Sequence, residues 1–278
     1  MSLLITPEEL ATLIDADAPV RVLDVRWRLD APDGRAAHAE GHIPTAVYVD
    51  LDDELAGPAS PAAGRHPLPS RQALQDAARR WGISAGDIVV VYDDAGSVPA
   101  SRAWWLLSHS GVTDVRVLDG GLGGWRSSGG ALEEGEVSPT PGDVELTDLD
   151  LGIGIDIDDA AGWSERGVLV DVRAAERYRG EVEPIDPIAG HIPGAVNLAL
   201  PAFVEAGRFR DPAALRDAFA AAGAVEGRPV AAYCGSGVGA TQAALAGALA
   251  GISVAVYPGS WSQWSNTPGR PVATGATP

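Results

Sequence analysis

The single cysteine of the chain, Cys234, has neighbours that favour nucleophilic sulfur chemistry. It follows the apolar run 229–233 and begins the segment Cys-Gly-Ser-Gly-Val-Gly-Ala, which leads into a helical pattern from Thr241. Alternating glycines allow successive backbone N–H groups to curl around an anion, and the following helix adds the positive end of its dipole. Such a place stabilises a thiolate, which is the reactive form of cysteine. A lone cysteine elsewhere packs as a small hydrophobic residue, but this strand–loop–helix setting predicts a functional one.

Two reactions fit a cysteine held by such a loop. Hydrolysis of a phosphate monoester needs an arginine six positions after the cysteine to clamp the phosphoryl oxygens. That position is Ala240 here, and residues 235–250 contain no arginine. Amides without a fixed positive charge suit a thiolate or persulfide better than a phosphate dianion. We therefore expect sulfur transfer, with the loop amides as binding groups: Gly235, Gly237, Val238, Gly239 and Ala240.

The composition excludes several other classes of function. The 278 residues carry a net charge of −18, from 38 acidic and 20 basic side chains, which disfavours nucleic acid and anionic membranes as partners. No apolar run approaches the roughly 20 residues of a membrane helix. The start of the chain, with Thr6 as a hydroxyl cap and Glu9 three residues later, is typical of a capped helix rather than a signal peptide. One cysteine forms no internal disulfide and no thiolate-rich metal site. We expect a cytoplasmic protein without metal or cofactor.

The sequence repeats itself once, with matching blocks in the same order at separations of 139 to 149 residues. Each half contains an Asp-Val-Arg strand, a Gly-His-Ile-Pro block, an apolar strand and a tryptophan-containing block. In the first half these are 22–26, 41–44, 90–93 and 120–125; in the second they are 168–173, 190–193, 231–234 and 259–264. His42 and His191 recur in both halves, one of which lacks a cysteine, so we expect a structural role for them.

Short β-rich runs alternate with helical patterns in each half, which predicts an α/β fold with parallel sheets flanked by helices. In the second half we expect strands at 168–172, 195–199, 229–233 and 253–257. The stretch around 131–153 is rich in glycine, proline and acidic residues and has the composition of a linker. We therefore expect domains at 1–130 and 154–278.

With these blocks in place, the chain resembles the tandem rhodanese family, in its 3-mercaptopyruvate and thiosulfate sulfurtransferase branch. The resemblance extends from both Asp-Val-Arg strands to the terminal Pro258-Gly259-Ser260-Trp261-Ser262-Gln263-Trp264. It implies two rhodanese-like domains, each with a mainly parallel five-stranded sheet, of which only the second is catalytic. Asp93 stands at the nucleophile position of the first domain and cannot carry sulfur.

The resemblance leaves the choice of sulfur donor open. The mercaptopyruvate branch typically has Cys-Gly-Ser-Gly-Val-Thr-Ala, which this loop matches except at Gly239, while the thiosulfate branch has a basic residue in the loop. Arg177 matches the first of two family arginines that hold the donor's carboxylate. The second is missing before the Gly-His-Ile-Pro block, and Arg179 or Arg102 are candidates to compensate. We favour 3-mercaptopyruvate, with thiosulfate as the alternative.

The resemblance also implies a proton relay through Ser236, His66 and Asp52, because release of pyruvate requires protonation of an enolate. In the expected reaction Cys234 becomes a persulfide and passes its sulfur to a thiol or a thioredoxin-like acceptor. A non-catalytic module that binds sulfur compounds or oxyanions is the alternative from another class.

Overall fold

The computed structural model describes residues 2–149 and 153–278. Its contacts divide the chain into two compact units. The first comprises the chain up to Gly57, Pro69–Leu149 and Ala206–Phe209; the second comprises Pro58–Leu68, Asp150–Glu205 and Arg210–Pro278. Each unit thus includes one short segment from the other half of the sequence: residues 206–209 belong to the first unit and residues 58–68 to the second.

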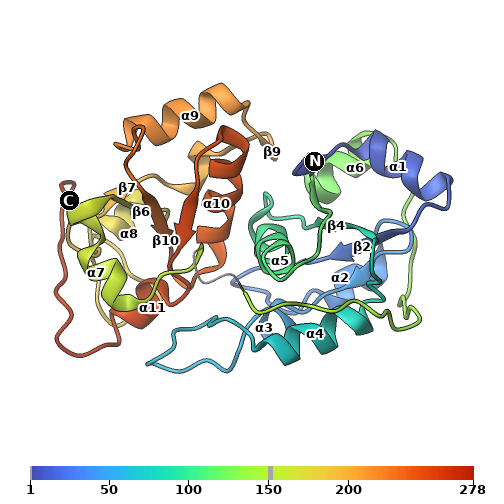
Figure 1. Cartoon of the computed structure of the whole chain (residues 1–278), viewed down its shortest axis with the longest axis horizontal. Helices are drawn as coiled ribbons and strands as arrows, with labels where there is room; N and C mark the ends of the chain where they lie inside the picture. Colours follow the sequence, from blue (N-terminus) through green and yellow to red (C-terminus); the bar gives the residue numbers. More distant parts are fainter. Residues whose placement is uncertain (1, 150–152) are drawn as a thin grey trace. The chain divides into compact units, whose positions relative to one another are not determined.

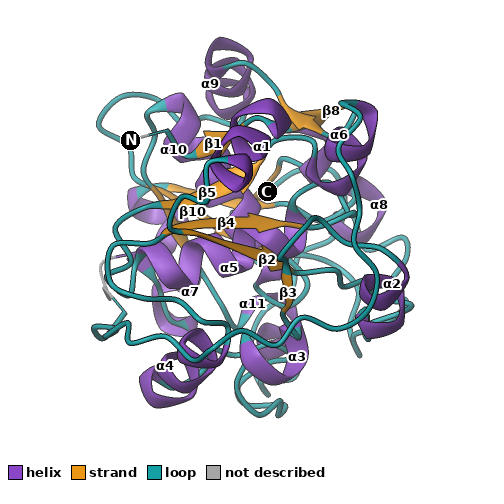
Figure 2. Cartoon of the chain, turned by 90° about the vertical axis from the view of Figure 1, so that its right-hand side faces the viewer, coloured by secondary structure: helices purple, strands orange, loops and turns teal. Residues whose placement is uncertain are grey.

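The first unit contains a five-stranded sheet in the order β1-β5-β4-β2-β3, in which every pair of neighbouring strands is parallel. Its strands, which run side by side through this unit (Figure 2), are β1 (Leu4–Ile5), β2 (Val20–Asp24), β3 (Val47–Tyr48), β4 (Ile88–Tyr92) and β5 (Val115–Leu118). Its helices are α1 (Pro7–Asp15), α2 (Arg35–Glu40), α3 (Leu51–Glu54), α4 (Arg71–Arg80), α5 (Val98–Ser108) and α6 (Gly121–Ser127). The expected cap of the first helix is confirmed, because Thr6 and Glu9 form a reciprocal capping box.

The second unit contains a parallel sheet in the order β11-β10-β6-β7. Its strands are β6 (Val168–Asp171), β7 (Val196–Asn197), β10 (Val230–Tyr233) and β11 (Val254–Val256), and they confirm the four strands expected from the sequence. Its helices are α7 (Ile157–Arg166), α8 (Ala175–Tyr178), η2 (Leu200–Ala202), α9 (Pro212–Ala221), α10 (Val238–Ala250) and α11 (Ser260–Trp264). A hairpin of β8 (Val204–Glu205) and β9 (Arg208–Phe209) forms a separate two-stranded sheet.

The described part of this second sheet has four strands rather than the five expected. The edge position next to β11 corresponds to that of β1 in the first unit. It is held by a single parallel bridge between Gly154 and Val256, closed by the N–H of Ile155 on the Val256 carbonyl at 2.9 Å. One bridge is too short to form a strand, so this edge is only partly extended.

Helices cover both faces of the second sheet (Figure 1): α10 and α9 pack on one side, and α7 and α11 on the other. The core under α7 and α11 is aromatic, with Trp163, Trp261 and Trp264 buried against Leu169 and Tyr233. On the opposite face α10 is almost entirely buried and consists mostly of alanine and glycine. Small residues allow this helix to approach the sheet closely, and its first turn follows the loop that begins at Cys234.

The two Gly-His-Ile-Pro histidines are fully buried and occupy equivalent positions in the two units. The backbone of His42 bridges Glu133, and that of His191 bridges Ala273. Each imidazole stacks on the aromatic side chain of a preceding helix, His42 on His38 and His191 on Tyr178. Both histidines therefore hold the chain that returns after the last helix of their unit. These contacts agree with a structural role.

No helix in residues 2–149 or 153–278 is long and apolar enough to cross a lipid bilayer. Within the same residues, no cluster of histidine, cysteine, aspartate and glutamate side chains could hold a metal ion.

Candidate active site

Cys234 directly follows β10, at the carboxyl edge of the parallel sheet, and its side chain is buried. The N–H of Gly237 donates to its Sγ at 3.1 Å. Hydrogen bonds from the Cys234 N–H to Ser260 and from the Trp261 N–H to the Cys234 carbonyl fix the backbone on both sides of the side chain. The loop thus presents the sulfur to a backbone donor, as the sequence pattern predicts for an anion cradle.

Gly237 makes this turn possible. Its φ of 87° lies in the left-handed region, where an L side chain is strained, and a Cβ would collide with the carbonyl oxygen of Pro258. It caps α10, which begins at Val238. Glycine at this position therefore brings the loop amide within hydrogen-bond distance of the sulfur.

Gly239 leaves a narrow space without a side chain between the nucleophile and Leu200. A Cβ at this position would lie 3.7 Å from Sγ of Cys234 and 3.1 Å from Cδ1 of Leu200. The threonine of the mercaptopyruvate branch would place its hydroxyl in this space. The structure thus gives a physical meaning to the one difference between this loop and the mercaptopyruvate pattern.

Two residues of the predicted relay, Ser236 and His66, lie side by side. Nδ1 of His66 lies 2.8 Å from Oγ of Ser236, and both residues are buried. Asp52 is an exposed residue of the first unit, in the first turn of α3, where its N–H donates to Asp50. The structure therefore brings Ser236 and His66 together in one unit, while the role of Asp52 stays a prediction.

Segment 58–68, which carries His66, is fixed to the C-terminal motif of the second unit. The N–H of Arg65 donates to Oγ of Ser262 at 3.1 Å, and Nε2 of Gln263 donates to the Ala62 carbonyl at 2.7 Å. The sequence boundary at 130 assigns this segment to the first domain, but its contacts are with the unit of Cys234. The end of the Trp261–Trp264 motif thus has a second role: it positions a segment distant in sequence against the cysteine loop.

Two guanidinium groups converge on Gly235, the residue after the nucleophile. A Cβ on Gly235 would lie 3.1 Å from Nη2 of Arg65 and 3.6 Å from Nη1 of Arg177. Arg177 was expected there from its sequence block, whereas Arg65 was not. The available signal was its place next to His66, since a segment that brings the relay histidine to the loop brings its neighbour as well.

The two arginines suggested as substitutes for the missing one have partners of their own. Arg102 is completely buried in the first unit, where Nε and Nη2 donate to the Leu55 carbonyl at 3.2 Å. Arg179 is directed to Glu181, with both hydrogen bonds at 2.7 Å. Compensation by either arginine stays a prediction, while the second guanidinium observed beside Gly235 is that of Arg65.

Two buried carboxylates neutralise the arginines of the site. Glu183 accepts from Nη2 of Arg177 at 2.6 Å and from Nη1 of Arg173 at 3.3 Å. Asp186 forms an ion pair with Arg65 and lies 3.4 Å from Nη2 of Arg177. Burial raises the pKa of Asp186 above its usual value, and the hydrogen bond from Arg65 opposes this effect. The sequence analysis did not single out either carboxylate.

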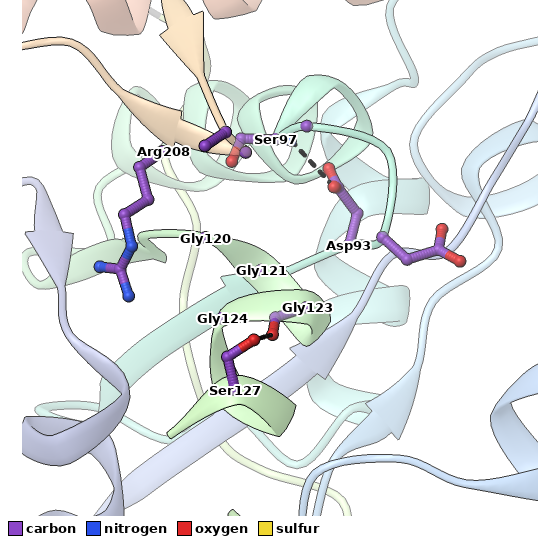
Figure 3. A pocket seen from close by; sticks show the side chains of 12 residues that line it. Asp93, Ser97, Gly120, Gly121, Gly123, Gly124, Ser127 and Arg208 are labelled. Carbon is purple, nitrogen blue, oxygen red and sulfur yellow. Dashed lines mark hydrogen bonds between the residues drawn. The ribbon is translucent and has the colours of Figure 1, made fainter. Parts of the chain in front are cut away.

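The corresponding loop of the first unit is filled by its own anion (Figure 3). Oδ1 of Asp93 accepts the N–H groups of Ala95 and Ser97 at 2.8 and 2.9 Å, and Oδ2 accepts that of Ala100 at 2.9 Å. Burial raises the pKa of Asp93 to about 6, against the lowering effect of these hydrogen bonds. A cavity of about 360 Å³ opens beside it, with Arg208 at its border. A carboxylate therefore occupies the cradle that surrounds sulfur in the second unit.

Comparison with known proteins identifies the family. Residues 6–128 and 156–267 match the rhodanese-like domain. The chain is 47% identical over 98% of its length to a Mycobacterium tuberculosis protein named for thiosulfate sulfurtransferase activity, covering 97% of that protein. It is 43% identical, over 98% of both chains, to a Pseudomonas aeruginosa protein named for 3-mercaptopyruvate sulfurtransferase activity.

A solved structure shows the same architecture. The crystal structure of SseA from Escherichia coli, presented as a 3-mercaptopyruvate sulfotransferase with the rhodanese fold, superimposes with a TM-score of 0.84 at 30% identity. The match covers 94% of this chain and 99% of that chain. The chain therefore belongs to the rhodanese family and is a tandem-domain sulfurtransferase.

Proposed function

We propose that the chain transfers sulfur from 3-mercaptopyruvate to a thiophilic acceptor through a persulfide on Cys234. The observation that carries this proposal is the contact of Ser236 with His66 beside the nucleophile, at 2.8 Å. A proton donor at this place suits 3-mercaptopyruvate, because loss of its sulfur leaves a carbon that must be protonated. The sulfur of thiosulfate leaves sulfite behind, which needs no such proton.

The first half-reaction loads sulfur onto Cys234. The Cys234 thiolate attacks the sulfur of the donor, a sulfur–sulfur bond forms, and the carbon–sulfur bond breaks with its electron pair on carbon. The resulting enolate of pyruvate takes a proton from Ser236, and His66 returns one to the serine. The N–H of Gly237 and the other loop amides (235–240) stabilise the negative charge on the thiolate and then on the persulfide.

The second half-reaction restores the thiolate. An acceptor (cyanide in an assay, a thiol or a thioredoxin-like protein in the cell) attacks the outer sulfur, and the electron pair of the sulfur–sulfur bond returns to Cys234. Double displacement of this kind gives ping-pong kinetics. A reactive free thiol persists in a reducing compartment, so we assign the reaction to the cytoplasm.

Thiosulfate is the second candidate donor, because a relative at 47% identity is named for that activity. A non-catalytic role in binding sulfur compounds is the third candidate, and the presence of Cys234 within its loop opposes it.

The deciding experiment compares the two donors side by side. Steady-state transfer to cyanide is measured with 3-mercaptopyruvate and with thiosulfate, while intact-mass spectrometry detects a one-sulfur adduct. We expect a higher kcat/KM with 3-mercaptopyruvate, and an adduct in the wild type that Cys234→Ser lacks. A higher kcat/KM with thiosulfate would transfer the assignment to that donor. Turnover by Cys234→Ser would disprove the persulfide route.

A further inference from the structure

A carboxylate of the protein lies between the two arginines beside the cysteine loop. Oδ1 of Asp186 pairs with Nη1 of Arg65, and Oδ2 lies 3.4 Å from Nη2 of Arg177. The Asp186 side chain is only 2% exposed. Both guanidinium groups also border Gly235, next to the nucleophile. A small carboxylate thus already occupies a bridging position at the site where an anionic donor has to bind.

The charges of the arginines are balanced before any donor arrives. Glu183 accepts from Arg177 at 2.6 Å, and Asp186 is the counter-ion of Arg65. An arriving carboxylate therefore gains little from either guanidinium unless one internal carboxylate leaves. Burial raises the pKa of Asp186, because a buried charge loses hydration, and this loss is offset only by its two arginines.

The surroundings of the two carboxylates show which one can leave. Glu183 is held more firmly, since it pairs with Arg173 as well as with Arg177, at 3.3 and 2.6 Å. Asp186 lies on a segment, residues 181–189, without helix or strand. Val182, Ile185 and Ile188 of this segment are exposed apolar side chains. Moving residues 184–188 outward breaks the bonds from the Ile185 and Asp186 N–H groups to Glu183 and the bond from Nε1 of Trp261 to the Ile188 carbonyl, but no helical or sheet hydrogen bonds.

Arg65 has unused capacity for an acceptor. Its Nε is buried and has no hydrogen-bond partner among the described residues. Its backbone is fixed by Ser262, so the guanidinium stays beside the loop when its counter-ion changes. A guanidinium binds a carboxylate most strongly through two parallel N–H bonds.

We propose that Arg65 binds the carboxylate of the sulfur donor together with Arg177, and that Asp186 is an internal stand-in which the donor displaces. The inference rests on the proposed function and assigns two specificity-determining residues to it. Arg65 takes the place of the second arginine that the sequence lacks, from a segment about 110 residues earlier in the chain than Arg177. Because an entering anion must displace Asp186, this carboxylate sets the affinity that an anion needs in order to bind the two arginines.

The first test is Asp186→Asn, which keeps the size of the side chain and removes its charge. We expect KM for 3-mercaptopyruvate and the inhibition constant of pyruvate each to fall about tenfold, as a difference of 1.4 kcal/mol implies. The matched control is Glu181→Gln, the same change of charge on an exposed side chain of the same segment that pairs with Arg179. The control should leave both constants unchanged. Equal effects of the two variants would overturn the role of Asp186.

The second test is Arg65→Gln, with Arg65→Lys as the conservative variant. We expect KM for 3-mercaptopyruvate to rise about tenfold or more in Arg65→Gln and to recover only partly in Arg65→Lys, because lysine lacks the planar pair of donors. The value of kcat at saturation should change little, since the arginine binds the part of the donor that does not react. An unchanged KM in both variants would exclude Arg65 from the donor site.

A third measurement uses the unmodified protein and does not depend on the folding of a variant. Hydrogen exchange is followed with and without saturating pyruvate, the carboxylate product. We expect faster exchange in residues 184–188 when pyruvate is bound, because Asp186 has left its arginines. Protection or no change in this segment would contradict displacement. If the wild type acquires no sulfur adduct at all, the proposed function fails instead, which the mass spectrum shows separately.

Discussion

Oγ of Ser236 and Nδ1 of His66 lie 2.8 Å apart, although 170 positions separate the two residues in the sequence. The contact exists because segment 58–68 packs on the C-terminal motif of the second unit through Ser262 and Gln263. A buried imidazole that is hydrogen-bonded to a buried hydroxyl can supply a proton without contact with bulk water. In the proposed reaction this pair supplies the proton that the cysteine and its loop amides do not provide.

Replacement of Ser236 by alanine should separate the two donors. With 3-mercaptopyruvate the enolate loses its proton source, and we expect kcat to fall roughly 100-fold or more, the usual contribution of general acid catalysis. With thiosulfate no carbon is protonated, so kcat should change by no more than a few-fold. Side-by-side steady-state rates provide the measurement, and the thiosulfate rate serves as an internal control for folding. Equal losses with both donors would assign Ser236 to the loop structure.

His66→Gln tests whether the histidine acts through the serine. If the two residues form one relay, the double variant with Ser236→Ala should be no slower than either single variant, because groups that act as a unit are not additive. The measurement is a double-mutant cycle on kcat with 3-mercaptopyruvate. Additive losses would show that His66 and Ser236 act independently.

The sequence predicted those parts of the molecule that local patterns determine. Alternating glycines after an apolar strand indicated the cysteine loop, and Thr6 with Glu9 indicated the first helix; the structure shows both. The repeated Gly-His-Ile-Pro blocks indicated duplication, and the two histidines form the same backbone bridges in both units. Such features depend on residues close together in sequence, so their physical causes can be read directly.

Contacts between distant segments could not be read in this way. Arg65 is a charged residue in a proline-rich stretch, and only its place next to His66 indicates that it lies beside the cysteine loop. The family's second arginine is expected in the segment before Gly-His-Ile-Pro, and that segment instead contains the carboxylates Glu183 and Asp186. The packing of residues 58–68 against Ser262 and Gln263 places Arg65 beside Gly235. Such packing depends on the whole fold and not on neighbouring residues in the sequence.

Gly235→Ala should weaken donor binding without unfolding the protein. The new Cβ would lie 3.1 Å from Nη2 of Arg65 and 3.6 Å from Nη1 of Arg177, and these are the ends of flexible side chains that can move aside. We expect KM for 3-mercaptopyruvate to rise about tenfold while the melting temperature stays unchanged. Gly162→Ala is the control, since its Cβ meets no atom within 4 Å. A lower melting temperature with an unchanged KM would place the effect in the loop backbone.

Gly239→Thr should speed transfer from 3-mercaptopyruvate. A Cβ at this position lies 3.7 Å from Sγ of Cys234, so the threonine hydroxyl can donate to the sulfur as its charge changes. One such hydrogen bond, of about 1 kcal/mol, corresponds to a several-fold increase in kcat/KM. Gly239→Val has the same shape without the hydroxyl and measures the cost of crowding Leu200, 3.1 Å from the new Cβ. Equal rates for the threonine and valine variants would exclude the hydroxyl effect.

Asp93→Asn should change how the stability of the protein depends on pH. The pKa of Asp93 is about 6 in the folded protein, raised by burial from 3.8, so the folded state holds the proton more tightly than the unfolded state does. The contribution of Asp93 to stability is therefore full below pH 3.8 and declines as the pH rises to about 6. The total decline is about 3 kcal/mol, from about two pKa units at 1.36 kcal/mol each.

Asparagine does not titrate, so the free energy of unfolding of the wild type should fall relative to that of Asp93→Asn over this interval. Urea unfolding at a series of pH values measures the difference in free energy of unfolding between the two proteins. The substitution also removes an acceptor for the Ala100 N–H, but the cost of that loss does not vary with pH. A difference that does not vary with pH would show that Asp93 ionises in the folded protein as it does in the unfolded chain.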